Sequence, residues 1–237
     1  MILWSWGHLL VFNLHNQLRS RAEDAINKPW RPIPRGRISE QQTVELLYFL
    51  YPLMVCMSAC VGGLRVSVLE LAACLWYNEF KGSADPLLKN LLNGIGITCF
   101  MAGPLELLLQ DPATSNNGRL GQWIIILAGA IVMTVHVQDF RDMPGDGAAG
   151  RVTLPIAMGD TNARILAAVS AACFTYISCW LWEARMVDCS AALVTTMMLD
   201  ISLFLHRSQR SDDFLWKKLW FVWILSLFLM PVLKVHI

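Results

Sequence analysis

The segment Gln138-Asp139-Phe140-Arg141-Asp142-Met143-Pro144-Gly145-Asp146 follows a long apolar stretch, and it decides how the rest of the chain is interpreted. Residues 120–137, directly before it, contain no Asp, Glu, Lys or Arg. A stretch of this length and composition can cross a lipid bilayer. On an α-helix, Asp142 and Asp146 would lie one turn apart on one face, with Asp139 one turn earlier. The sequence therefore predicts carboxylates gathered where a membrane helix ends.

A second cluster lies near the start of the chain. Asn16, Ser20 and Asp24 are spaced four residues apart, so they would share one face of a helix continuing from the apolar segment 2–19. Hard oxygen ligands beside an apolar cavity are what a magnesium–diphosphate headgroup requires. Arginine matches phosphate geometry with its fork of donors, and lysine supplies a compact charge. Each cluster is followed by such bases, the nearest being Lys28, Arg31, Arg35 and Arg151.

The composition is that of a polytopic membrane protein. Hydrophobic residues make up 55% of the chain, charged residues only 16%, and the mean hydropathy is +0.46, whereas soluble domains carry about a quarter charged residues. The net charge of +1 gives no indication of nucleic-acid binding. We expect an all-α bundle of about eight spans in one domain, residues 1–237, with spans near 2–19, 42–62, 64–78, 88–109, 120–140, 162–183, 187–206 and 214–235.

The distribution of Lys and Arg over the connections predicts the orientation in the membrane. If eight spans alternate, one side receives 15 of the 19 basic residues and the other receives only Arg65, Arg119, Arg185 and Lys234. The basic side is expected to be cytosolic. Both acidic clusters lie on that side, so we expect them to face each other across one cavity mouth. The expected location is the endoplasmic reticulum or another internal membrane.

Other polar residues give weaker indications. The seven cysteines form no Cys-x2-Cys pair and are interpreted as small hydrophobic residues, without zinc or disulfides. Asp160 is expected to be a helix N-cap. Asn90 and Asn93 are candidates for the cavity mouth, with hydrogen bonding between helices as the alternative. Asp200 is an intramembrane carboxylate, with a functional role and pairing inside the bundle as open alternatives.

Two longer motifs resemble those of the UbiA superfamily of intramembrane prenyltransferases. Asn16-x7-Asp24, continued by Asn27-Lys28-Pro29-Trp30-Arg31-Pro32, is similar to the first motif. Asp139-x2-Asp142-x3-Asp146, continued by Gly150-Arg151-x-Thr153-Leu154-Pro155, is similar to the second. Two stretches, Glu23-Asp24-Ala25-Ile26-Asn27-Lys28-Pro29-Trp30-Arg31-Pro32 and Tyr77-Asn78-Glu79, look most like a fungal branch that includes membrane-bound sesquiterpene cyclases. The resemblance covers essentially the whole chain.

The resemblance implies a helical bundle around a central cavity that binds an isoprenyl diphosphate through Mg²⁺ and ionises it. It implies catalytic roles for Asp24, Asp139, Asp142 and Asp146. The implied magnesium ligands are Asn16, Glu23, Asp24, Asp139, Asp142 and Asp146, and the implied diphosphate-binding residues are Lys28, Arg31, Arg35 and Arg151.

The chain departs from the family pattern in three ways. The usual first motif is Asn-x3-Asp-x3-Asp, and Ser20 occupies its middle acidic position; either Glu23 compensates or the first site holds its metal with fewer charges. Gly147 stands where many relatives carry Arg. Relatives commonly have nine spans, so the first would be absent from this chain.

Three functions remain open on the sequence. The first is terpene cyclisation in secondary metabolism, with farnesyl diphosphate as the expected substrate. The second is transfer of the prenyl group to an aromatic or polyketide acceptor, which needs a docking position for this hydrophobic partner. The third is a non-catalytic membrane protein or transporter, although transporters more often place charged sites near the bilayer midplane.

Overall fold

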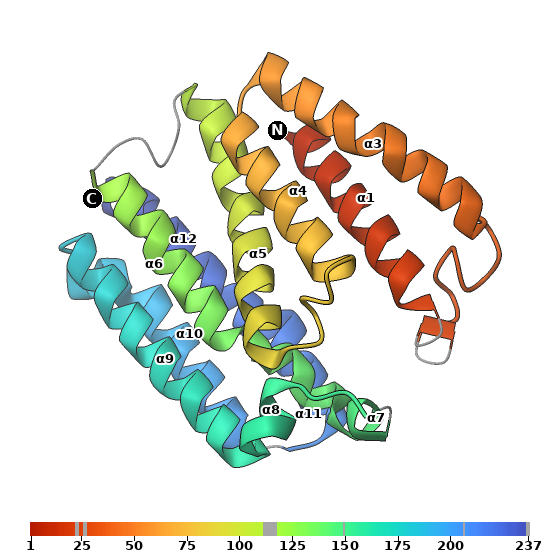
Figure 1. Ribbon diagram of the computed structural model, residues 1–237. Helices are drawn as coiled ribbons and strands as arrows, with labels where there is room; N and C mark the ends of the chain where they lie inside the picture. The colour runs from red at the N-terminus through yellow and green to blue at the C-terminus, as the bar shows by residue number, and fades with distance from the viewer. Residues whose placement is uncertain (22–23, 26–27, 111–117, 149, 206, 236–237) are drawn as a thin grey trace. The chain divides into compact units, whose positions relative to one another are not determined.

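The computed structural model describes residues 1–235 except 22–23, 26–27, 111–117, 149 and 206, and these described residues contain helices and loops but no β-strand (Figure 1). The helices of the first half are α1 (Ile2–Arg19), α3 (Glu40–Val61), α4 (Leu64–Asn78) and α5 (Pro86–Leu109). Those of the second half are α6 (Arg119–Thr134), the 3₁₀ helix η1 (Val135–Asp142), α7 (Met143–Ala148), α8 (Leu154–Met158), α9 (Asp160–Leu181), α10 (Met186–Leu205), α11 (Gln209–Phe214), the π-helix η2 (Leu215–Trp220) and α12 (Phe221–Val235). The all-α prediction is confirmed.

The helices form two compact units. Unit 1 comprises residues 1–83 and 95–115, and it packs α1 against both α3 and α4 (Figure 1). Ser39 begins α3 with a capping box, and Gly62-Gly63 at positive φ turns the chain between α3 and α4. The core joins α1, α3 and α4 through Val11, Leu14, Leu47, Leu50, Met54, Leu71 and Cys74.

Two buried polar pairs of unit 1 join its helices. Trp4 Nε1 donates to Ser58 Oγ over 2.9 Å, and His8 Nε2 lies 2.7 Å from Ser67 Oγ. Polar groups in lipid must be satisfied inside the protein, so these contacts make α1 compatible with an apolar surrounding.

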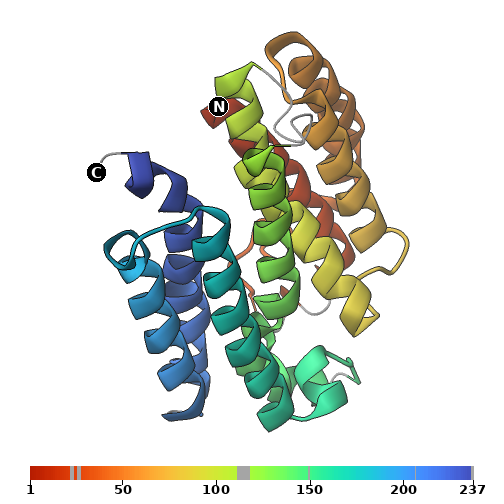
Figure 2. The same cartoon turned by 90° about the vertical axis from the view of Figure 1, so that its left-hand side faces the viewer.

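Unit 2 comprises residues 84–94 and 116–237. Its long helices α6, α9, α10 and α12 pack side by side, as both views show (Figures 1 and 2). Trp220 and Trp223 are buried in this unit and donate their indole N–H groups to Thr134 and Thr175, over 2.8 and 2.9 Å. The short helices α7, α8 and α11 gather with η1 at one end of the unit, where α9 begins and α10 ends.

Six segments among the described residues are long and apolar enough to cross a membrane: Glu40–Val61, Pro86–Leu109, Arg119–Ala148, Asp160–Leu181, Met186–Leu205 and Gln209–Leu233. Each agrees within a few residues with a predicted span, apart from longer ends at 148 and 209. The predicted spans 2–19 and 64–78 are helical, as α1 and α4, but they do not meet the same criterion. At 15 residues α4 extends only about 22 Å. The count of eight stays a prediction.

Two predicted details are wrong. The expected span over 120–140 is not α-helical throughout, because it changes at Val135 to a 3₁₀ helix; Asp139 still lies one turn before Asp142. Asp160 is not an N-cap: Gly159 holds that position, and the Asp160 carboxylate accepts a hydrogen bond from Arg164 Nε instead. Competition from a nearby arginine explains the second difference.

Candidate functional site

The first motif begins at the end of α1. The Ser20 hydroxyl donates to the Asn16 carbonyl over 2.7 Å and lies 3.0 Å from Asp24 Oδ2, where it also donates. The Asp24 amide in turn bonds to the Ser20 carbonyl over 2.8 Å, which continues the helical pattern past Arg19. Asn16, Ser20 and Asp24 therefore adjoin, as their spacing predicts.

Asp24 is the charged centre of this motif. Its side chain is only 1% exposed. Arg31 Nη1 lies 2.6 Å from Asp24 Oδ2, and Lys28 Nζ lies 4.0 Å from Oδ1. Arg35, the third predicted phosphate-binding base, is exposed. Glu23, the predicted replacement for the missing carboxylate, lies outside the described residues. The structure thus brings two of the predicted bases onto one buried aspartate within unit 1.

A second polar cluster of unit 1 lies beside the first motif. Glu79, which directly follows α4, accepts from His15 Nε2 over 2.5 Å and from Arg19 Nη2 over 2.6 Å. Burial acts to raise the pKa of the Glu79 carboxyl, but the hydrogen bonds from His15 and Arg19 and their charges outweigh it, so that pKa is held below its usual value. These contacts fix the end of α1, and with it Asn16, against α4.

The second motif lies in unit 2 on η1 and α7, and its three aspartates have different surroundings. Asp139 and Asp146 are buried, whereas the side chain of Asp142 is 52% exposed. Arg151 Nη1 approaches Asp146 Oδ1 to 3.8 Å, and the Arg151 amide donates to the Asp146 carbonyl over 2.9 Å. The predicted base Arg151 is therefore close to its motif.

Asp139 has a partner that the sequence did not predict. Lys89 Nζ, from the first turn of α5, lies 2.6 Å from Asp139 Oδ1, and both side chains are buried. The approach depends on Gly94, because a Cβ there would lie 2.2 Å from Val132 Cγ2 and 3.2 Å from Val132 Cα. Only glycine lets α5 pass α6 this closely. The sequence did offer one indication of this partner. Lys89 is next to Asn90, a candidate for the cavity mouth, and lies on the same predicted side of the membrane as both motifs.

The residues of the second motif fit a hard cation in part. Asp139 Oδ2 and Asn90 Oδ1, both in unit 2, are buried oxygens without a hydrogen-bond partner in the described part of the chain. Buried polar oxygens normally have a hydrogen-bond partner, so these two are available to coordinate a bound group. Oxygen is the ligand that Mg²⁺ prefers. Within the same described residues, however, no group of three or more His, Cys, Asp or Glu side chains is arranged to hold a metal ion. The oxygens fit magnesium, while a complete protein-only cage is not formed.

A cavity of about 510 Å³ lies elsewhere in unit 2. Its walls include Arg119, Gln122 and Tyr176, near the start of α6 and the end of α9. None of the predicted site residues lines this cavity, and η1 follows the opposite end of α6. We therefore assign the cavity no role in the chemistry.

The sequence profile of the UbiA prenyltransferase family matches residues 1–225. The chain belongs to the UbiA prenyltransferase family. This confirms the resemblance and the predicted enzyme class. With its apolar helices, the UbiA-family chain is an integral membrane protein.

Members of the family with similar sequences include synthases and transferases. The fumagillin beta-trans-bergamotene synthase of Aspergillus fumigatus is 30% identical over 230 residues, which cover 97% of this chain and 78% of that protein. A somaliensene A/B synthase of Streptomyces somaliensis is 31% identical over 69% of this chain and 53% of its own length. A polyprenyl transferase of Hericium erinaceus is 31% identical over 73% and 60%, respectively. The chain thus spans little more than half the length of the latter two.

A solved structure from work on the biosynthesis of digeranylgeranylglyceryl phosphate synthase in membranes shares the fold. It superposes with a TM-score of 0.59 over 98% of this chain and 87% of that one. At 18% identity this likeness establishes the UbiA-type fold.

Proposed function

We propose that the protein ionises an isoprenyl diphosphate, with farnesyl diphosphate as the candidate substrate, in a magnesium-dependent reaction, and that it cyclises the resulting carbocation to a terpene. The observation that carries the proposal is the buried Lys89–Asp139 pair, in which one carboxylate oxygen has no partner among the described residues. A buried cation beside an unsatisfied hard oxygen suits an anionic ligand held together with a divalent metal ion.

The bases of both motifs would contribute to diphosphate binding. Each of these bases forms an ion pair with an aspartate of a motif: Lys28 and Arg31 with Asp24, Arg151 with Asp146, and Lys89 with Asp139. Magnesium, when bound to the aspartates, would neutralise the leaving diphosphate and lower the barrier to cleavage of the allylic C–O bond. The carboxylates would then exchange partners, which frees the ammonium and guanidinium groups to donate to phosphate oxygens. The ligand set proposed for magnesium remains Asn16, Glu23, Asp24, Asp139, Asp142 and Asp146.

Similarity favours cyclisation over transfer. The bergamotene synthase, which matches 97% of this chain, is named for a terpene product, whereas the polyprenyl transferase matches a smaller part of it. Cyclisation requires only the diphosphate, while transfer also requires an acceptor. Prenyl transfer to an aromatic or polyketide acceptor is therefore the second candidate function.

The purified protein in detergent, given farnesyl diphosphate and Mg²⁺ alone, should release diphosphate and a volatile hydrocarbon. Turnover that begins only after an aromatic acceptor is added would instead support prenyl transfer. Absence of diphosphate release with farnesyl, geranyl and geranylgeranyl diphosphates, with or without acceptors, would support a non-catalytic role.

The assignment of the second motif needs its own variant. Replacing Asp142 and Asp146 together by Asn should abolish Mg²⁺-dependent diphosphate release, because two proposed ligands lose their charge. Glu45→Gln is the matched control, since Glu45 is an exposed carboxylate on α3 that accepts a hydrogen bond from Gln41 one turn earlier. Unchanged release from the double variant refutes the proposed roles of these two aspartates.

We further propose that residues 1–237 act as one prenyltransferase domain in the endoplasmic reticulum or another internal membrane, with both motifs towards the cytosol. The family match over residues 1–225 and the charge distribution support this proposal. In sealed microsomes, a single cysteine placed at exposed Arg35 in a chain whose own cysteines are replaced should react with a membrane-impermeant maleimide from outside. Labelling that occurs only after the microsomes are permeabilised would reverse the proposed orientation.

A further inference from the structure

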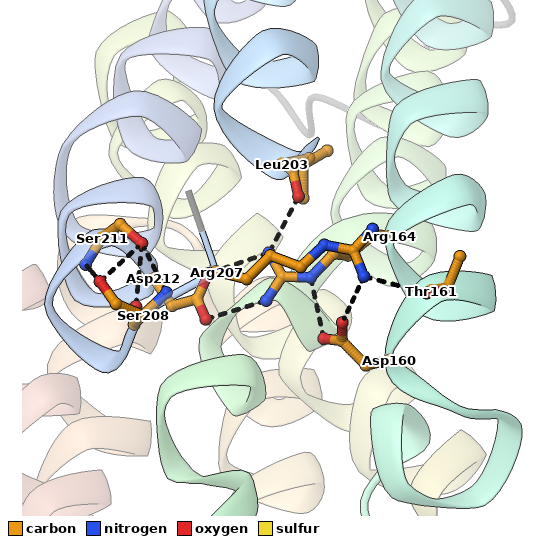
Figure 3. A network of polar contacts seen from close by, with 8 residues as sticks. All are labelled: Asp160, Thr161, Arg164, Leu203, Arg207, Ser208, Ser211 and Asp212. Atoms are coloured by element: carbon orange, nitrogen blue, oxygen red, sulfur yellow. Dashed lines mark hydrogen bonds and ion pairs between the residues drawn. The ribbon is translucent and has the colours of Figure 1, made fainter. Parts of the chain in front are cut away.

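A buried arginine joins three elements beside the second motif. Arg164, one turn after the start of α9, has a side chain that is 2% exposed. Its Nη1 and Nη2 donate to the two carboxylate oxygens of Asp212, each over 2.9 Å. Its Nε donates to Asp160 Oδ1 over 2.8 Å, and Nη1 also reaches the Leu203 carbonyl at 3.1 Å (Figure 3). Every guanidinium nitrogen therefore has a protein partner, in the bidentate arrangement that is strongest for Arg.

The same guanidinium covers the ring of Phe140. Arg164 Cζ lies 4.2 Å from the ring centroid, a distance typical of a cation–π contact. Phe140 is buried and directly follows Asp139 in η1. The guanidinium of the ion pair thus contacts the side chain of a residue that lies between two proposed magnesium ligands.

Arg141, the next residue of η1, is also joined to α11. Arg141 Nη1 forms an ion pair with Asp213, which follows Asp212 on α11. Asp213 also accepts from Lys217 over 2.8 Å. Both residues between Asp139 and Asp142 are therefore tied to α11, Arg141 directly and Phe140 through Arg164.

Such support matters because η1 is an unusual element. It runs for eight residues as a 3₁₀ helix, whereas runs longer than three or four residues are uncommon, since their hydrogen-bond geometry is poor. Its conformation must come from side-chain packing. Ligands that are held loosely lose metal affinity, and groups behind the ligands typically change that affinity by about 10–100-fold when they are mutated.

We propose that Arg164 and Asp212 are positioning residues for the second aspartate motif: through Phe140 their ion pair fixes the 3₁₀ helix that presents Asp139 and Asp142. The inference rests on the proposed function of this motif. The competing explanation is that the pair only joins α9, α10 and α11.

The double variant Arg164→Met/Asp212→Leu separates the two explanations. Replacing both partners of a buried ion pair by apolar residues is often neutral for stability, whereas removing one partner is not. We expect thermal unfolding near that of the wild type, but an increase of about tenfold or more in the Mg²⁺ concentration for half-maximal diphosphate release. Amide hydrogen exchange over residues 135–142 should also become faster.

Arg119→Met/Glu183→Gln is the matched control, because it removes an ion pair at the opposite end of α6 in the same unit. It should change neither the Mg²⁺ dependence nor the exchange of η1. If the Arg164/Asp212 variant folds and keeps both wild-type values, the pair has a purely structural role and the proposal is overturned.

Two further measurements cover the remaining outcomes. If the double variant does not fold, Phe140→Leu removes the ring and leaves the ion pair; it must then show the same increase in Mg²⁺ requirement and exchange, and wild-type values overturn the proposal. If the wild type releases no diphosphate, the proposed function fails. Hydrogen exchange of η1 still decides whether the ion pair orders this helix.

Discussion

Lys89 and Asp139, fifty residues apart, form a buried ion pair in which Nζ and Oδ1 are 2.6 Å apart and the second carboxylate oxygen has no partner among the described residues. Removing one partner of a buried pair is costly because an uncompensated charge remains. Lys89→Met should therefore destabilise the protein by about 3–5 kcal/mol, measured as unfolding in detergent. Lys218→Met, which removes an exposed lysine of the same unit, should leave unfolding nearly unchanged.

Magnesium should reverse part of this defect. A divalent cation on Asp139 would replace the missing ammonium, so the Lys89→Met variant should gain more thermal stability from added Mg²⁺ than the wild type does. An equal gain in both proteins would contradict a metal site at Asp139.

Ser20→Asp should restore the usual charge pattern of the first motif. The Ser20 hydroxyl now lies 3.0 Å from Asp24 Oδ2, so a carboxylate there would repel Asp24 in the absence of metal. We expect a lower unfolding temperature without Mg²⁺ and a larger stabilisation by Mg²⁺ than in the wild type. Ser20→Asn is the uncharged control, and a similar response from both variants would argue against metal binding at this position.

Gly94→Ala tests the close approach that brings Lys89 to Asp139. The new Cβ would meet Val132 at 2.2 Å, so α5 has to shift away from α6. Overpacking of this kind costs about 1–3 kcal/mol, and diphosphate release should fall with it. Gly96→Ala is the control on the same helix, because nothing lies within 4 Å of its Cβ position. That substitution should be neutral or stabilising by up to about 1 kcal/mol.

Glu79 should make stability depend on acid pH. Its folded-state pKa is below the ordinary value of 4.5 because His15 and Arg19 outweigh the effect of burial. The carboxylate therefore stabilises the fold above that ordinary value, and the contribution is lost as pH falls through the lower folded-state pKa. The unfolding temperature of the wild type should exceed that of Glu79→Gln at about pH 7, and the two should converge as the pH falls below 4.5. A difference that stays constant down to about pH 3.5 would disprove this explanation.

Sequence reasoning located the long helices well because their ends have local causes. The predicted span 64–78 coincides with α4, which Gly62-Gly63 precedes, and the predicted span 88–109 begins two residues inside α5. The first motif was also predictable: Ser20 and Asp24 adjoin because consecutive helical turns place them together.

The parts that were missed depend on tertiary contacts. Nothing local indicates that Lys89 meets Asp139, because that contact needs α5 to pass α6 at Gly94. Likewise, the 3₁₀ conformation of η1 depends on packing from α9 and α11, through Arg164 and Asp213, which lie far along the chain. Asp160 was misjudged for the same reason, since its partner Arg164 is buried by the rest of unit 2.

The 3₁₀ helix also sets the direction in which the second motif leaves α6. Each of its residues turns by about 120° and rises about 2.0 Å, against about 100° and 1.5 Å in an α-helix. Over eight residues the accumulated difference is roughly 160° in direction and 4 Å in length. An α-helical continuation of α6 would therefore send the last side chain of this segment, Asp142, towards nearly the opposite side. Within the 3₁₀ helix three residues make one turn, so Asp139 and Asp142 lie on one face: Asp139 is buried against Lys89, and Asp142, at the end of the helix, is exposed, where an incoming charged headgroup would meet it first.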